Sequence, residues 1–190
     1  MQTVVYLPYF LSWVVLGGIF LDMLSPSSGI INQIITALGG KSIFFLGDNR
    51  YFKPTLIVTD IWKNFGYGAI VYLAAILGID TDLYEAAQID SASKWQQFRK
   101  ITLPLLSPTT FYALIITIIN SFQVFDQIWI MTAGEPTADL VPVMVTEIYK
   151  NSFQYQKMGY ATALSWILFA IIIGVTIFQN VMQKKWVHYE

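Results

Sequence analysis

Two rows of polar side chains interrupt apolar stretches of this sequence, and their spacing places each row on one face of a helix. The first row is Asp60, Lys63, Asn64 and Tyr67, and the second is Thr117, Asn120 and Ser121, with the apolar Val124 at the next position of the same face. Both rows follow the i, i+3, i+4, i+7 pattern. Ionisable and amide groups inside a membrane are costly unless they face a partner or a water-filled cavity. The rows therefore predict a shared hydrophilic cavity whose side chains can hydrogen-bond a polar solute.

The same residues allow other interpretations. Asp60 and Lys63 could pair with each other, and the amides could join neighbouring helices through hydrogen bonds worth about 0.6–2 kcal/mol each. Asp126, a carboxylate within an apolar stretch, could instead carry protons, as in an ion-coupled secondary transporter or a channel that needs no ATPase. Catalysis is not expected, because no Ser–His or paired-carboxylate arrangement has plausible spacing and His188 lies near the end of the chain.

The apolar stretches that carry these rows are long enough to be membrane spans. Of the 190 residues, 55% are hydrophobic and 12% are charged, and a spanning helix needs roughly 20 mostly apolar residues. Four windows qualify, at about residues 3–24, 54–78, 105–131 and 159–183. We predict an all-α membrane protein in which residues 1–190 form a single transmembrane domain.

The composition also limits which metals, cofactors and partners this chain is expected to bind. One His and no Cys nearly exclude zinc, haem, thiol catalysis and disulfides, so no metal site is expected. A net charge of −1 argues against a nucleic-acid partner. The sequence has no Gly-rich phosphate-binding loop of the Walker type, so we expect this chain itself to bind no nucleotide cofactor.

A polar segment at residues 80–104 separates the second and third windows. Asp80 and Asp82 favour a helix that runs to about Asp90, because acidic groups stabilise a helix N-terminus. Ser93 and Gln96 form a capping box for a second helix, which Pro104 should end. From physics alone, this segment could equally be an amphipathic connector that lies on the lipid surface.

The two other links each predict a short surface helix. Ile30, Ile34 and Leu38 recur at helical spacing before the stop signal of Gly39 and Gly40. In the last link, a stretch from Pro142 through Phe153 has one apolar face. We expect both links on the same side of the membrane.

The spacing of Glu85-Ala86-Ala87, Ser91 and Ile101-Thr102-Leu103-Pro104 resembles the cytoplasmic EAA loop of permease subunits in binding-protein-dependent ABC importers. The resemblance continues through Phe125-Asp126 and through Gly159-Tyr160-Ala161-Thr162-Ala163-Leu164-Ser165. It is closest to the carbohydrate-uptake branch, in particular the maltose- and glycerol-phosphate-type first permease. It implies a MetI-like helical bundle of the type I importers that here lacks its first two spans.

The resemblance implies a transmembrane permease subunit of an ATP-driven importer for a sugar, either an oligosaccharide or a sugar derivative. In that family the EAA loop couples closure of the ATPase dimer to alternating access. The matching coupling positions are Glu85, Ala86, Ala87, Asp90, Ser91, Ile101, Leu103 and Pro104. The implied partners are a second permease subunit, a pair of ATPase subunits that bind ATP and Mg²⁺, an extracellular solute-binding protein and the bacterial plasma membrane.

The two polar rows match positions that line the sugar site of maltose-type permeases, although their side chains differ. The resemblance therefore implies the location of a sugar path and not the identity of the sugar. Amides and carboxylates pair with hydroxyls, while aromatic rings such as those of Trp62, Tyr67 or Trp129 cover apolar sugar faces. The loop departs from the family at Ser91, where glycine is usual, and a left-handed backbone there would cost Ser about 1 kcal/mol.

Overall fold

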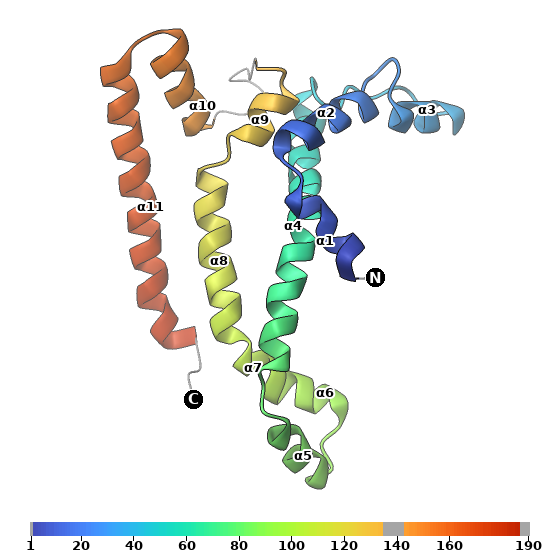
Figure 1. Ribbon diagram of the computed structural model, residues 1–190, viewed down its shortest axis with the longest axis vertical. Helices are drawn as coiled ribbons and strands as arrows, with labels where there is room; N and C mark the ends of the chain where they lie inside the picture. Colours follow the sequence, from blue (N-terminus) through green and yellow to red (C-terminus); the bar gives the residue numbers. More distant parts are fainter. Residues whose placement is uncertain (1, 135–142, 187–190) are drawn as a thin grey trace. The chain divides into compact units, whose positions relative to one another are not determined.

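The computed structural model describes residues 2–134 and 143–186, and this part of the chain is helical without strands (Figure 1). The all-α prediction is thereby confirmed. The helices form two compact units, one from residues 1–66 and 122–169 and the other from residues 67–121 and 170–190. The long helices α4, Asn49–Leu77, and α11, Met158–Trp186, each contribute to both units.

The first unit is organised around the start of α4. Its other elements are α1 (Gln2–Phe10), α2 (Trp13–Met23), α3 (Ile30–Ala37), α9 (Asp126–Met131), α10 (Met144–Tyr149) and the π-helical turn η2 (Lys150–Gln154). The hydrophobic core joins α4 to α9 through Phe52, Leu56, Ile128 and Met131. Gln127 is 3% exposed beside this core. Its Nε2 donates to the Leu56 carbonyl at 2.8 Å and to Thr59 Oγ1 at 2.9 Å.

The first apolar window consists of two helices, α1 and α2, rather than one. Ser12 separates them with an extended backbone, and its Oγ accepts a hydrogen bond from Val15 N at 3.3 Å. This N-cap satisfies a donor that a continuous helix would have paired with a backbone carbonyl. Helix α1 packs closely on α4, because a Cβ added at Gly66 would overlap the backbone of Val5 and Tyr6.

The link between α2 and α4 contains the helix predicted at Ile30. Helix α3 ends at Ala37 with Leu38 as its C-cap, and Gly39 follows with φ 85, as the glycine stop signal predicts. Asn32 holds the loop around this helix and is 3% exposed. Ile30, Ile34 and Leu38 are 54%, 53% and 84% exposed, so the apolar face of α3 lies open. Its location at a membrane surface stays a prediction.

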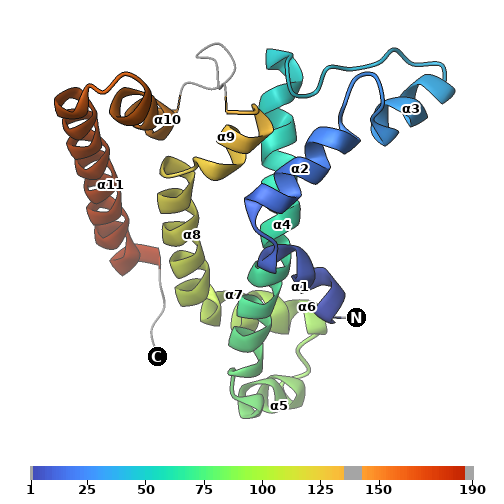
Figure 2. The same cartoon turned by 45° about the horizontal axis from the view of Figure 1, so that its top comes forward.

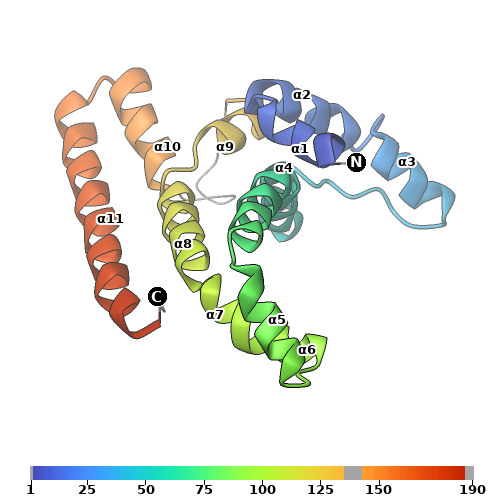
Figure 3. The same cartoon turned by 60° about the horizontal axis from the view of Figure 1, so that its bottom comes forward.

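The second unit contains the end of α4, the segment at residues 80–104 and the helix that follows it. Its elements are α5 (Thr81–Ile89), α6 (Lys94–Gln97), the π-helical turn η1 (Phe98–Thr102), α7 (Leu103–Leu105) and α8 (Ser107–Phe122). Figures 2 and 3 show α5 and α6 side by side at one end of this unit. The chain bends by 64° between α4 and α5, and by 56° between the α6–α7 stretch and α8.

The number of membrane spans depends on how the bent helix pairs are counted. Among the described residues, the stretch Met158–Gln183 is long and apolar enough to cross a membrane by itself. Up to three spans result if each bent helix pair counts as one, and α2 is a shorter apolar helix. The four-span arrangement therefore stays a prediction.

Candidate functional site

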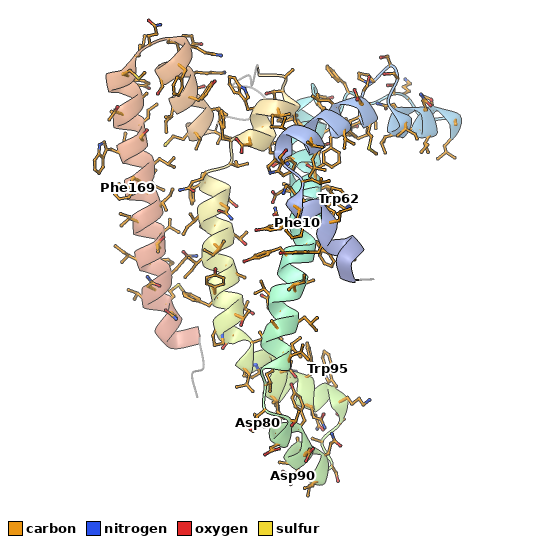
Figure 4. All side chains as sticks on the ribbon, viewed as in Figure 1. Phe10, Trp62, Asp80, Asp90, Trp95 and Phe169 are labelled. Carbon is orange, nitrogen blue, oxygen red and sulfur yellow. The ribbon has the colours of Figure 1, made fainter. Side chains whose placement is uncertain are left out.

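The first helix of the predicted coupling loop is α5. Asp80 caps it, with its carboxylate accepting a hydrogen bond from Asp82 N at 3.0 Å. The helix ends at Ile89 with Asp90 as its C-cap, in agreement with the predicted end at about Asp90. Glu85 and Ala86 are exposed on this helix and Ala87 is half-buried. Figure 4 shows Asp80 and Asp90 near the two ends of α5.

Ser91 forms the joint between the two loop helices in a left-handed conformation, with φ 57. Ser91 N donates to the Gln88 carbonyl at 3.0 Å, and Ala92 N donates to the Ala87 carbonyl at 2.9 Å. This pair of bonds is the Schellman motif, in which glycine usually occupies the left-handed position. The bend therefore has the backbone that glycine favours, and the serine costs about 1 kcal/mol.

The second loop helix begins with the predicted capping box, which the structure confirms. Ser93 Oγ accepts from Gln96 N at 3.3 Å, and Gln96 Oε1 accepts from Ser93 N at 2.8 Å. The rings of Trp95 and Phe98 stack with centroids 5.6 Å apart. They are 68% and 41% exposed. The helix thus presents an apolar aromatic face beside the joint.

The sequence predicts that Pro104 ends this helix, and the helical stretch ends one residue later, at Leu105, before the 56° bend into α8. The backbone continues through the π turn η1 into α7, which contains Pro104. In η1, Leu103 N donates to the Phe98 carbonyl, five residues earlier. Proline has no backbone N–H and so cannot donate to the carbonyl four residues earlier. The wider π turn accommodates this missing hydrogen bond and leaves space for the proline ring beside the preceding turn.

The predicted coupling residues all lie in the second unit. Glu85, Ala86 and Ala87 are on α5, Asp90 is its C-cap and Ser91 is the joint. Ile101 lies in η1, and Leu103 and Pro104 lie in α7, where Leu103 is 48% exposed. Their coupling role stays a prediction.

The polar row on α4 divides between the two units. Asn64 Nδ2 donates to Asp60 Oδ1 at 2.9 Å, and both residues are exposed. Lys63 is 8% exposed, and its Nζ donates to the Tyr9 carbonyl of α1 at 2.9 Å. Tyr67 follows Gly66, where the second unit begins, and is 37% exposed.

The ammonium group of Lys63 also lies near two aromatic rings, 5.3 Å from the Tyr9 centroid and 5.7 Å from that of Trp13. Direct pairing between Asp60 and Lys63, one of the alternatives from the sequence, is therefore not the arrangement seen. The lysine stabilises the contact between α1 and α4 instead. The hydrogen bond from Lys63 to Tyr9 could not be predicted from local sequence patterns, because Tyr9 lies 54 residues earlier.

The second polar row lies on α8 only as far as Ser121. Thr117, Asn120 and Ser121 are exposed, and Ser121 Oγ donates to the Thr117 carbonyl at 2.8 Å. Val124 does not extend this helical face, because α8 ends at Phe122 and Val124 packs against the core of the first unit. The prediction that Val124 shares a helical face with Thr117, seven residues earlier, is therefore wrong. A cavity shared by the two rows stays a prediction.

An aromatic cluster occupies the region where α8 gives way to α9. The Trp129 ring lies 5.5 Å from that of Phe125 and 4.5 Å from that of Tyr149, and Phe153 lies 5.1 Å beyond Tyr149. The sequence suggested Trp129 as a cover for a sugar ring, whereas here protein rings pack against it. Trp62 is more open, 49% exposed, with its edge toward Phe20 at 5.8 Å. The expected helix start at Pro142 lies outside the described residues, and α10 begins at Met144.

Similar proteins cover almost the whole chain. The polygalacturonan/rhamnogalacturonan transport system permease protein YteP of Bacillus subtilis (strain 168) is 30% identical over 97% of this chain and 57% of its own length. The "Probable starch degradation products transport system permease protein AmyD" of Thermoanaerobacterium thermosulfurigenes is 36% identical over 97% of this chain and 62% of its own length. The chain thus spans about three fifths of these relatives.

A solved structure has the same fold. A chain of a bacterial ABC transporter involved in the import of the acidic polysaccharide alginate superposes with a TM-score of 0.88 and 35% identity. The match covers 97% of this chain and 64% of that one. The MetI-like fold prediction and the resemblance to carbohydrate-uptake permeases are confirmed. Residues 1–188 also match the family model described as "binding-protein-dependent transport system inner membrane component". The chain therefore belongs to this family of membrane permease components.

Proposed function

We propose that this chain is a permease subunit of an ATP-driven importer that carries a sugar, an oligosaccharide or a sugar derivative, across the bacterial plasma membrane. The relatives and the solved structure are named for polygalacturonan and rhamnogalacturonan, starch degradation products and alginate. These cargoes are all carbohydrates. A carbohydrate is therefore the substrate class that the comparisons favour.

The partners follow from the same analogy. The alginate transporter has been solved in complex with a periplasmic protein bound to an alginate pentasaccharide. We expect an external solute-binding protein to deliver the sugar to this chain and a second permease to complete the path. A pair of ATPase subunits would bind ATP and Mg²⁺, so ATP hydrolysis would take place outside this chain.

The observation that carries the coupling proposal is the continuous path from the loop to the α8 helix. The exposed Trp95–Phe98 face lies on the helix that runs through η1 and α7 to the bend before α8. If the ATPase binds this face, its closure displaces the α5–α6 pair and biases the orientation of α8. Such coupling requires that nucleotide binds one arrangement of the complex more tightly than the other.

The substrate path would use the exposed polar groups of each row. Asp60 and Asn64 form a hydrogen-bonded pair on α4, and Asn120 and Ser121 lie open on α8. Carboxylate and amide groups of this kind exchange hydrogen bonds with sugar hydroxyls. Lys63 would act differently, by holding α1 against α4.

The decisive experiment substitutes the exposed loop surface in the full complex. Glu85→Lys and Ala87→Glu should abolish sugar uptake and the stimulation of ATP hydrolysis by the binding protein, because each introduces an unmatched charge into the ATPase contact. Ala37→Glu is the matched control, since Ala37 is exposed at the end of α3 and outside the loop. Normal uptake by the assembled Glu85→Lys complex would exclude the coupling role. Uptake that survives ATP depletion but collapses with the proton gradient would instead identify an ion-coupled transporter.

A further inference from the structure

A partly buried hydrogen bond connects the two ends of the coupling loop. The hydroxyl of Tyr84, on α5, lies 2.8 Å from Thr102 Oγ1, at the end of the π turn η1. Thr102 is 7% exposed. The two residues are 18 positions apart and both belong to the second unit.

Thr102 bonds a side chain across the coupling loop, whereas several other threonines donate to a carbonyl of their own helix. Thr55, Thr59, Thr132, Thr162 and Thr176 each donate to the carbonyl four residues earlier in their own helix. Such donations stay within one helix, although Thr59 Oγ1 also accepts from Gln127 Nε2. Thr102 bonds Tyr84 instead, at a place where the π turn alters the carbonyl spacing. Its hydroxyl thus serves the contact between two helices.

The position of the bond gives α5 a second connection to α8. Through the backbone, a displacement of α5 reaches α8 only by way of the left-handed Ser91, the short helix α6 and η1. The Tyr84–Thr102 bond bypasses Ser91 and α6 and ends one residue before α7. The 56° bend into α8 follows α7 directly. A hydrogen bond at this place joins α5 directly to the residue that precedes α7.

We infer that Tyr84 and Thr102 are positioning residues that make α5 and the root of α8 move as one body. This inference rests on the proposed coupling role of the loop. It assigns the transmission step to a hydroxyl pair that is separate from the exposed Trp95–Phe98 face. A broken bond should leave the ATPase bound and active while less of its motion reaches the permease helices.

The test compares sugar uptake with ATP hydrolysis in the full complex, reconstituted with its binding protein. Tyr84→Phe and Thr102→Val each remove one hydroxyl with little change of shape. Each should lower uptake per ATP hydrolysed by about fivefold, as expected for one hydrogen bond. The double variant should be no worse than either single one, because both remove the same bond. Thr102→Ser, which keeps the hydroxyl, should retain coupling.

Tyr112→Phe is the matched control, because Tyr112 is 54% exposed on α8 in the same unit. An unchanged ratio of uptake to hydrolysis in Tyr84→Phe would overturn the inference, as would additive losses in the double variant. Failure of both single variants to assemble would assign the bond to folding alone and would also overturn it. If Glu85→Lys uncouples the complex while Tyr84→Phe does not, only this inference fails. If neither changes uptake, the coupling proposal fails as well.

Discussion

Asn32 and Ile43 exchange two hydrogen bonds across the loop that follows α3. Asn32 Nδ2 donates to the Ile43 carbonyl at 2.9 Å, and Ile43 N donates to Asn32 Oδ1 at 2.8 Å. The same Nδ2 approaches the Ser25 carbonyl at 3.1 Å. One buried side chain therefore holds together both ends of the link between α2 and α4.

Asn32→Ala should lower the free energy of unfolding by about 2 kcal/mol, because it leaves partly buried backbone groups of Ser25 and Ile43 without this partner. Thermal unfolding of the purified complex in detergent measures the loss, and limited proteolysis should show earlier cleavage within residues 25–48. Gln33→Ala is the neighbouring control, since Gln33 is exposed and its Nε2 donates to the nearby Ser28 carbonyl. Equal stability of the two variants would contradict the bracing role of Asn32.

Ser91→Gly should stabilise the coupling loop by about 0.5–1 kcal/mol, because glycine adopts φ 57 without the strain that a Cβ imposes. Ser91→Val should have the opposite effect, since a β-branched residue fits a left-handed backbone worst. Amide hydrogen exchange of α5 reports both changes. Slower exchange in the valine variant than in the glycine variant would refute the strain at this joint.

Gly66→Ala should separate α1 from α4 and destabilise the protein by about 1–3 kcal/mol, the usual cost of overpacking. The added methyl group meets the backbone of Val5 and Tyr6, which cannot rotate away as a side chain can. Gly68→Ala is the control, two residues further along α4, where a Cβ meets nothing within 4 Å. That variant should be slightly stabilised by helix propensity. Thermal unfolding that fails to separate the two variants would contradict the close crossing.

Asn64→Ala and Asn120→Ala should each raise the KM for sugar uptake by about five- to tenfold, the cost of a lost hydrogen bond to a substrate hydroxyl. Assembly with the ATPase should not change, because neither residue lies in the coupling loop. Ile116→Ala serves as a control on α8, where Ile116 is 37% exposed. If the asparagine variants lose assembly instead of affinity, the amides join helices and do not contact substrate.

Local signals predicted the loop helices well. The Ser93–Gln96 box, the acidic start of α5 and the glycine stop of α3 depend on residues within one turn, so the sequence contains the whole interaction. Rules that assume a regular helix failed where the helix is irregular. Pro104 lies one residue before the end of its helix because η1 accommodates it, and Val124 leaves its predicted face because α8 ends two residues earlier.

Contacts between residues far apart in the chain were the hardest to predict from the sequence. Nothing near Lys63 indicates that its ammonium group bonds the Tyr9 carbonyl, and nothing near Gln127 indicates its bonds to Leu56 and Thr59. Each partner lies at least 54 positions away. The one available signal was a polar side chain within an apolar run, which marks a costly group but does not name its partner.

The π turn at Phe98–Thr102 also changes how this chain tolerates insertions and deletions. Such a turn holds one residue more than an α-helical turn, and one residue corresponds to about 100° of rotation around a helix. Deletion of Lys100 alone would hardly alter hydropathy, yet it would turn Leu103 to another side of the helix and press the Pro104 ring against the preceding turn. The orientation of Leu103 and the fit of the Pro104 ring therefore depend more on the number of residues in the π turn than on their chemical character. Relatives that lack one residue here should differ more in this turn than relatives with substitutions.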